Sequence, residues 1–299
     1  MNRVKVASMA RKIVRVPFAN INDEFLVVSA GDFHVGADAF NEAAFVEFLH
    51  QVVEKSKVHH VYVILMGDLF DSILFGDRRY SVASSSGTMD DSLLSLKEHL
   101  KPLLSNPSIH FVGSLTGNHE LAYCRGDINP IYRLYESTGI EPLGSKCYIY
   151  FDIAIGGRKL ATLRTVAFHG CANSRTPYGR MRIIREFLAE NDMTEDEFIR
   201  MNQVVFYGHT HETRVETVDR NIPNPRLGEW RTVRQYACLT GSFMDTANFK
   251  TNSYAAERGM SPMPVGYIET RVNLKEVVPV AVTDHGLNPG VSTIPWSQM

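Results

Sequence analysis

The sequence has few cysteines, few tryptophans and no long hydrophobic run. Its 299 residues include only 4 cysteines and 2 tryptophans, and no Cys-x-x-Cys pair occurs. This excludes a disulfide-rich secreted scaffold, so we expect reduced thiols in a cytoplasmic protein. The longest apolar run, Val61–Met66, is far shorter than the ~20 residues that span a bilayer, and we expect no membrane partner. The basic N-terminus also lacks the apolar stretch of a secretion signal.

Neither sign of charge dominates the chain. Lys and Arg total 31 against 33 Asp and Glu, which gives a formal net charge of −2. A globally basic nucleic-acid coat is therefore excluded, although a locally positive groove is not. The hydrophobic fraction of 44% and the charged fraction of 21% are ordinary for a globular protein. A chain of this length buries roughly three quarters of its unfolded surface and needs no disulfide or zinc to fold.

Short β-rich runs alternate with stretches of helical periodicity. The expected strands are Phe25–Ala30, His60–Met66, Ile109–Leu115, Cys147–Ile153, Leu160–Phe168, Val204–Tyr207, Gln235–Leu239 and Val265–Val272. The expected helices are Ala39–Lys55 with Asp38 as its cap, Asp90–Leu104, Tyr178–Glu190 and one opened by a capping box at Thr194–Glu197. This alternation predicts an α/β fold, a layered β-sandwich flanked by helices, with a second sheet packed on the first.

We expect one domain over residues 22–283, with an N-terminal arm over residues 1–21 and a C-terminal tail over residues 284–299. The arm is basic and contains no acidic residue; its cations are Arg3, Lys5, Arg11, Lys12 and Arg15. Two interpretations stay open for it: a flexible arm for nucleic acid, or a solubilising and poorly ordered end.

Polar side chains follow five of the expected strands, at the point where each strand ends. These segments are Asp32-Phe33-His34, Asp68-Leu69-Phe70-Asp71, Asn118-His119-Glu120, His169-Gly170 and His209-Thr210-His211. In open α/β sheets, ligands bind outside the carboxyl ends of strands, so the five segments are expected to share one crevice, which would be the active site. Glycine directly precedes four of the segments and permits tight turns and a close backbone approach.

The pooled side chains have the chemistry of metal ligands. They are two carboxylates, one amide and four imidazoles: Asp32, Asp68, Asn118, His34, His169, His209 and His211. In an extended segment residues two apart face the same side, which would place Asp32 beside His34 and His209 beside His211. Seven donors exceed the needs of one tetrahedral ion, whereas two ions sharing a carboxylate would use them all. Mixed oxygen and nitrogen donors favour two divalent ions, manganese first, with iron, zinc or magnesium as alternatives.

In their order, D-x-H, G-D-x-x-D, G-N-H-E, a single His and G-H-x-H resemble the calcineurin-like metallophosphoesterase superfamily. The match runs from Asp32 to His211, and the combination of five blocks is far more specific than any one of them. The resemblance implies that one metal is held by Asp32, His34 and His211 and the other by Asn118, His169 and His209, with Asp68 bridging both. It further implies catalytic roles for His119, near the leaving group, and for Asp71, which would orient His119.

The expected mechanism follows from charge. Two divalent ions and two carboxylates leave a net charge of roughly +2, which attracts a phosphate anion even in a chain that is acidic overall. Metals about 3.5–4 Å apart can share a bridging hydroxide that attacks the phosphorus. His119 is then the natural general acid for the leaving group.

Arginines near the five blocks are candidate substrate-binding residues, with ordinary solvated surface charge as the alternative. They are Arg78, Arg79, Arg125, Arg175 and Arg180. The expected substrate is a phosphodiester in nucleic acid or nucleotides, with DNA and RNA both candidates. This view is supported by Gly67-Asp68-Leu69-Phe70, which resembles the exonuclease subunit of bacterial and archaeal DNA-repair complexes. The chain is nevertheless too short for that family's full DNA-capping domain and partner-binding helices.

Two other functions stay open. Gly-Asn-His-Glu also occurs in serine/threonine phosphatases, which would make the chain a phosphomonoesterase. Those enzymes carry Asp-Arg-Gly in the second block, whereas this chain has Asp71-Ser72-Ile73 and lacks the arginine that clamps phosphate. A non-catalytic metal-binding scaffold is the third alternative, although every expected ligand and His119 are present.

Overall fold

The computed structural model describes residues 10–71, 88–123, 129–170, 204–224, 228–246 and 263–284. Its strands are β1 (Ala10–Phe18), β2 (Glu24–Ala30), β3 (His60–Leu65), β4 (Ile109–Ser114), β5 (Lys146–Ile155), β6 (Arg158–Phe168), β7 (Val204–Tyr207), β8 (Thr213–Asn224), β9 (Glu229–Thr240), β10 (Val265–Asn273) and β11 (Val277–Asp284). Its helices are α1 (Glu42–Ser56), α2 (Met89–Leu104), α3 (Asn118–Tyr123) and α4 (Pro130–Thr138).

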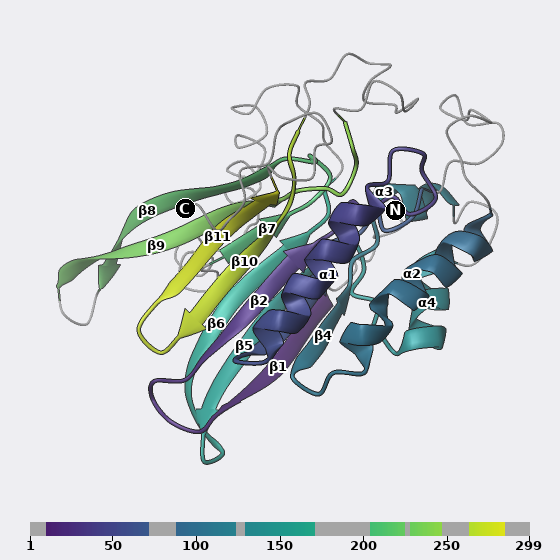
Figure 1. Cartoon of the computed structure of the whole chain (residues 1–299). Coiled ribbons are helices and arrows are strands. Elements are labelled where there is room, and N and C mark those ends of the chain that lie inside the picture. Colours follow the sequence, from purple (N-terminus) through teal and green to yellow (C-terminus); the bar gives the residue numbers. More distant parts are fainter. Residues whose placement is uncertain are drawn as a thin grey trace, which may run out of the picture.

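The strands form two sheets (Figure 1). One sheet has six strands in the order β1-β5-β6-β7-β9-β8, and the other has five in the order β11-β10-β2-β3-β4. Strands β2, β3 and β4 run parallel to one another, as do β6, β7 and β9. Parallel neighbours end at the same edge of a sheet, so the loops after β2, β3 and β4 meet there, and so do those after β6 and β7.

Successive side chains of the central strands point to opposite faces of the five-stranded sheet, and each face has its own hydrophobic core. On β3, Val61 and Val63 belong to a cluster that includes Phe45 and Phe48 of α1, whereas Tyr62 lies on the opposite face. Helices α1, α2 and α4 cover the first face (Figure 1). Side chains two residues apart share a face of a strand, which explains this division.

The second face of the five-stranded sheet packs against the six-stranded sheet. Phe25 of β2 is fully buried there, with its ring 5.4 Å from Tyr62 and 5.7 Å from Phe151 of β5. Val16, Phe206 and Cys238 join the same cluster from the six-stranded sheet. The expected α/β fold, with two packed sheets and flanking helices, is therefore confirmed.

The expected N-terminal arm is wrong for residues 10–18, which form the edge strand β1 and pair in parallel with β5. Buried and exposed side chains alternate in this segment: Val16 and Phe18 are buried, whereas Arg11, Arg15 and Pro17 are exposed. The positive charges made this strand pattern hard to recognise in the sequence. Residues 1–9, and all of the expected tail beyond Asp284, lie outside the described residues.

The two described helices that the sequence predicted are present, with one cap reassigned. Helix α1 begins after Asn41, whose side chain accepts a hydrogen bond from the backbone of Ala44 at 3.0 Å, so the expected cap at Asp38 is wrong. Helix α2 begins after Thr88 in a capping box with Asp91. The helices expected at Tyr178–Glu190 and after Thr194 lie outside the described residues. The described part contains no helix long and apolar enough to span a membrane.

Candidate metal centre

The candidate ligands lie on loops that follow the strands of both sheets. Asp32 and His34 follow β2, Asp68 follows β3, and Asn118 begins α3 after β4. The remaining three come from the six-stranded sheet: His169 follows β6, and His209 and His211 follow β7. The structure brings all seven into neighbouring contacts. Metal ligation itself stays a prediction, but the expected meeting of these loops is a feature of the fold.

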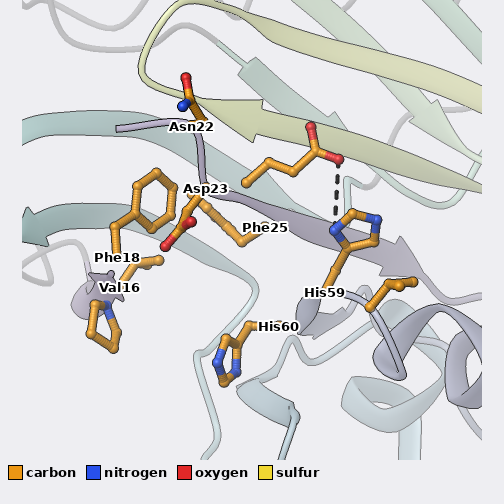
Figure 2. Close-up of a pocket in the computed structure, with 10 residues that line it drawn as sticks. Val16, Phe18, Asn22, Asp23, Phe25, His59 and His60 are labelled. Carbon is orange, nitrogen blue, oxygen red and sulfur yellow. Dashed lines mark ion pairs between the residues drawn. The ribbon is translucent and has the colours of Figure 1, made fainter. Parts of the chain in front are cut away.

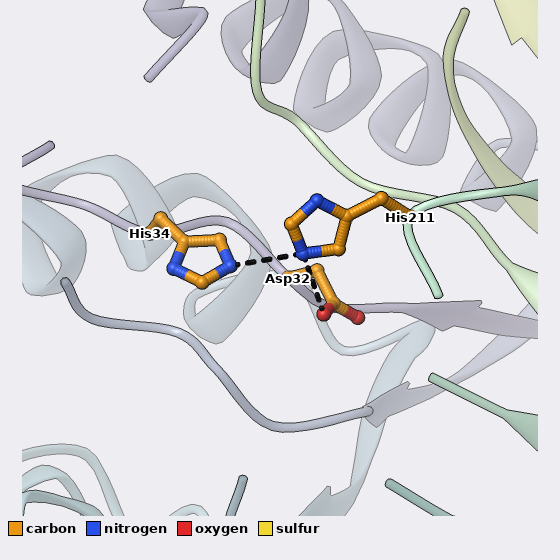
Figure 3. A group of neighbouring side chains, drawn as sticks. All are labelled: Asp32, His34 and His211. Atoms are coloured by element: carbon orange, nitrogen blue, oxygen red, sulfur yellow. Dashed lines mark hydrogen bonds and ion pairs between the residues drawn. The ribbon is translucent and has the colours of Figure 1, made fainter. Parts of the chain in front are cut away.

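The first group consists of Asp32, His34 and His211 (Figure 3). The Nε2 atom of His211 lies 3.3 Å from Nε2 of His34 and 3.3 Å from Oδ1 of Asp32. Asp32 is fully buried, and its Oδ2 accepts a hydrogen bond from the backbone of His209 at 3.0 Å. Among the described residues, neither this Oδ1 atom nor the buried Nδ1 atom of His34 has a hydrogen-bond partner. A cation among these donors would satisfy the orphaned carboxylate oxygen.

The second group consists of Asp68, His169 and His209, with Asn118 beside it. The Nε2 atom of His169 lies 3.1 Å from Oδ2 of Asp68 and 3.2 Å from Oδ1 of Asn118. Its Nδ1 atom lies 2.7 Å from the carbonyl oxygen of Met66. When Nδ1–H donates to that carbonyl, the lone pair of Nε2 faces Asp68 and Asn118. This is the arrangement in which histidine binds metals.

Asp68 connects the groups. Besides the second group, it forms a third with His34 and His119, in which one donor atom from each residue lies within 4.8 Å of the others. Its Oδ1 accepts a hydrogen bond from the backbone of His119 at 2.8 Å. A carboxylate placed between two sets of imidazoles is the side chain that could bridge two cations.

The backbone is left-handed at five candidate ligands. Among the described residues, the non-glycine positions with positive φ are Asp32, His34, Asp68, His209 and His211, with φ between 47° and 64°. Non-glycine residues adopt this conformation rarely, and strained backbone of this kind clusters at functional sites. The expectation of extended D-x-H and H-x-H segments is therefore wrong, although Asp32 does lie in one group with His34, as predicted. His209 and His211 consequently belong to different groups instead of pointing together.

Glycines allow the loops to approach closely at two points. A Cβ atom on Gly117 would lie 2.1 Å from Oδ1 of Asp68, and one on Gly67 would lie 2.7 Å from the backbone nitrogen of Gly117. Gly67 also has a φ of 86°. A side chain at either position would displace Asp68 or the loop that carries Asn118, which explains why glycine precedes these polar residues.

His119 and Asp71 form a pair at the side of the cluster. Nδ1 of His119 lies 3.4 Å from Oδ1 of Asp71, and both side chains are largely buried. The His119 ring packs edge-on against that of His34, with 4.6 Å between ring centres. The backbone of Asp71 donates to the carbonyl of Val35 at 3.0 Å, so the loop after β2 holds Asp71 in place.

Burial and neighbouring charges shift the pKa values of these groups in opposite directions. Burial alone would lower the pKa of His169, but the Asp68 carboxylate beside it raises that pKa to about 10. The pKa of Asp68 is held far below its usual range by His169, against the effect of burial. Burial lowers the pKa of His34 and of His209, which keeps both imidazoles neutral near neutral pH.

Glu120 is not among the candidate site residues that the sequence predicts. The structure places its carboxylate, fully buried, directly beneath the loop that carries Asp68. Burial and the charge of Asp68 raise the pKa of Glu120 to about 7, while the backbone N–H of Gly117 opposes the rise. The available signal was its position in the first turn of a helix that begins with a candidate ligand.

The candidate substrate-binding arginines cannot be placed in the site. Arg78, Arg79, Arg125, Arg175 and Arg180 all lie outside the described residues. A pocket of about 390 Å³ lies elsewhere, at the amino ends of β2 and β3, where Phe25 and His60 line it (Figure 2). His59 and Glu24 form an ion pair in it at 3.6 Å (Figure 2). None of the candidate metal ligands lines this pocket.

The donor set fits divalent metal ions. Oxygen and imidazole nitrogen donors without thiolates suit manganese, iron or zinc. The carboxylates are buried, their neighbouring imidazoles face them, and Oδ1 of Asp32 accepts no hydrogen bond within the described part of the chain. These residues could therefore hold metal at the carboxyl ends of the strands, which is where an α/β fold binds its ligands.

No protein-family model and no curated protein matches the chain. Among solved structures, a conserved uncharacterized protein from Streptococcus pneumoniae, described as a predicted phosphoesterase, matches with 12% identity and a TM-score of 0.35. That match covers 90% of this chain and 96% of the other. A variant of a cold-active protein tyrosine phosphatase matches with 11% identity and a TM-score of 0.36, covering 91% and 82%. At these TM-scores neither structure bears on function, which is inferred from the residues of this chain.

Proposed function

We propose that this chain is a phosphoester hydrolase of the calcineurin-like metallophosphoesterase type, dependent on two divalent metal ions and acting on phosphodiesters. One observation carries the proposal: seven donor side chains from five loops meet beside a buried histidine–carboxylate pair. A structural core does not require so many buried imidazoles and carboxylates, since buried charges are costly unless they are paired or bind metal.

Asp32, His34 and His211 would hold one ion, and Asn118, His169 and His209 the other. Asp68 would contact both. Manganese is the first candidate, with iron, zinc and magnesium as alternatives. Two such ions would supply positive charge for the phosphoryl oxygens and would lower the pKa of a water molecule that could serve as nucleophile.

The chain itself supplies the proton for the leaving group. Asp71 faces Nδ1 of His119, which orients the ring and leaves Nε2 as the nitrogen that delivers a proton. Because both side chains are largely buried, their orientation is fixed before the substrate binds. His119 is the general acid in this proposal, and Asp71 acts through it.

A phosphodiester is favoured over a phosphomonoester by sequence features of the same loops. The second block reads Asp71-Ser72-Ile73 and lacks the arginine that clamps a monoester in serine/threonine phosphatases. Gly67-Asp68-Leu69-Phe70 resembles the block found in the exonuclease subunit of DNA-repair complexes. The substrate class we propose is therefore nucleic acid or nucleotides, with DNA and RNA as the first polymers to test.

The test compares hydrolysis of bis(4-nitrophenyl) phosphate and 4-nitrophenyl phosphate by Mn²⁺-loaded protein, with His119→Ala as the control. We expect the diester to be preferred and the preference to disappear in the variant. A preference for the monoester would instead assign a phosphomonoesterase. Tight Mn²⁺ binding without cleavage of either ester, or of DNA, RNA and cyclic nucleotides, would identify a non-catalytic scaffold and overturn the proposal.

A further inference from the structure

The carboxylate of Glu120 accepts hydrogen bonds from four backbone N–H groups of two different loops. Oε2 accepts from Gly117 at 2.7 Å and from Asp68 at 3.0 Å. Oε1 accepts from Leu69 at 2.7 Å and from Phe70 at 3.3 Å. Each oxygen thus has two donors, and the side chain has no exposed surface.

We propose that Glu120 is a positioning residue that fixes the loop carrying Asp68 against Gly117 and the start of helix α3, which carries Asn118 and His119. The inference concerns how the metal centre is held together, and its link to catalysis rests on the proposed function. Three of the four donors are consecutive residues that begin at Asp68, where φ is 47°. Glu120 therefore stabilises the left-handed conformation that directs the Asp68 carboxylate toward both groups of imidazoles.

Only a carboxylate of this length fits the arrangement. The four N–H donors, two on each oxygen, match the four lone-pair positions of a carboxylate. Glutamine would replace one oxygen with an NH₂ group that faces two N–H donors, and those donors would lose their acceptor. Aspartate is one methylene shorter and cannot reach both loops at these distances. Buried N–H groups that lose their acceptor are destabilising, because they have also lost their hydrogen bonds to water.

The test measures Mn²⁺ affinity of the full-length protein by calorimetry for Glu120→Gln, with circular dichroism to verify folding. We expect affinity to fall by about 10- to 100-fold, the range observed when partners that orient metal ligands are removed. Glu269→Gln is the matched control. Glu269 lies on β10, is largely buried and forms an ion pair with Lys55. That variant is expected to bind Mn²⁺ like the wild type.

A second measurement covers the case in which Glu120→Gln does not fold. In wild-type protein treated with EDTA, the amide protons of Asp68, Leu69, Phe70 and Gly117 should exchange slowly with solvent by NMR. Rapid exchange at these amides would overturn the proposal, as would a folded Glu120→Gln protein with unchanged Mn²⁺ affinity. If the wild type cleaves no phosphoester but the variant loses Mn²⁺ affinity, the proposed function fails and the role of Glu120 stands.

Discussion

The imidazole of His169 lies 3.1 Å from the carboxylate of Asp68, and in the metal-free protein the two groups form an ion pair near neutral pH. A metal ion that takes Nε2 of His169 must displace its proton. We expect about one proton to be released per protein at pH 8, and Mn²⁺ affinity to rise with pH up to about 10. Calorimetry in buffers of different ionisation enthalpy measures this. Heats that do not depend on the buffer would contradict it.

The same pair predicts how the stability of the metal-free protein depends on pH. The pKa of His169 is raised from 6.5 to about 10 by folding, so the folded state binds this proton more tightly than the unfolded chain. The resulting stabilisation is complete below pH 6.5 and is lost as the pH rises through about 10. Urea unfolding in EDTA between pH 6.5 and 10 should show this loss. In His169→Gln this loss of stability between pH 6.5 and 10 should be absent.

Substitutions at Asp68 and His211 should have different effects on metal content. Asp68 contributes to two groups of donors, whereas His211 contributes to one. We expect Asp68→Asn to lose both ions and His211→Ala to retain one, as measured by elemental analysis after dialysis against Mn²⁺. Retention of two ions by Asp68→Asn would exclude a bridging role for this carboxylate.

Gly117→Ala should disrupt the centre through steric contact alone. The added Cβ would lie 2.1 Å from Oδ1 of Asp68, and Gly117 does not have a positive φ. We expect Mn²⁺ affinity to fall by at least about tenfold, because Asp68 must move. Gly139→Ala is the control, since its Cβ would meet no described residue within 4 Å and its φ of 78° should cost only about 1 kcal/mol of folding stability. Equal metal affinities in the two variants would contradict the prediction.

His119→Ala and Asp71→Asn should slow diester hydrolysis to different extents. Loss of a general acid typically costs about 10²- to 10⁴-fold in rate, and we expect His119→Ala to fall within this range. Asp71 acts only through His119 at 3.4 Å, so Asp71→Asn should cost less and should shift the basic limb of the kcat profile, where the general acid loses its proton. Mn²⁺ content should be unchanged in Asp71→Asn. A rate equal to that of the wild type would remove Asp71 from the mechanism.

The sequence predicted the strands and the residues at their ends, because both depend on local pattern. Runs such as His60–Leu65 are short, apolar and followed by glycine and a polar residue, which marks the end of a buried strand. Strand β1 was not predicted, because its positive charges suggested a solvent-exposed arm. The alternation that buries Val16 and Phe18 was therefore not recognised as a strand pattern. Its partner β5 lies more than a hundred residues further along the chain, so no local signal identifies the pairing.

The backbone at the site could not be predicted from local pattern either. An alternating D-x-H or H-x-H segment suggests an extended strand, yet Asp32, His34, His209 and His211 are left-handed. Contacts between loops hold them in this conformation, such as the hydrogen bond from the backbone of Asp32 to the carbonyl of Gly67 at 2.9 Å. The acceptor role of Glu120 was missed for the same reason, because its four donors belong to loops that only the folded chain brings together.

The division of the donors between two sheets has a consequence for the maturation of the protein. Asp32, His34, Asp68 and Asn118 belong to the first half of the chain, and His169, His209 and His211 to the second. Neither half contains a complete set for two ions, and β2 gains its neighbour β10 only after residues 265–273 have been synthesised. On our proposal, the ions would enter last, after the sheets have packed. Cellular metal supply would then govern how much of the finished protein is active, while folding proceeds without it.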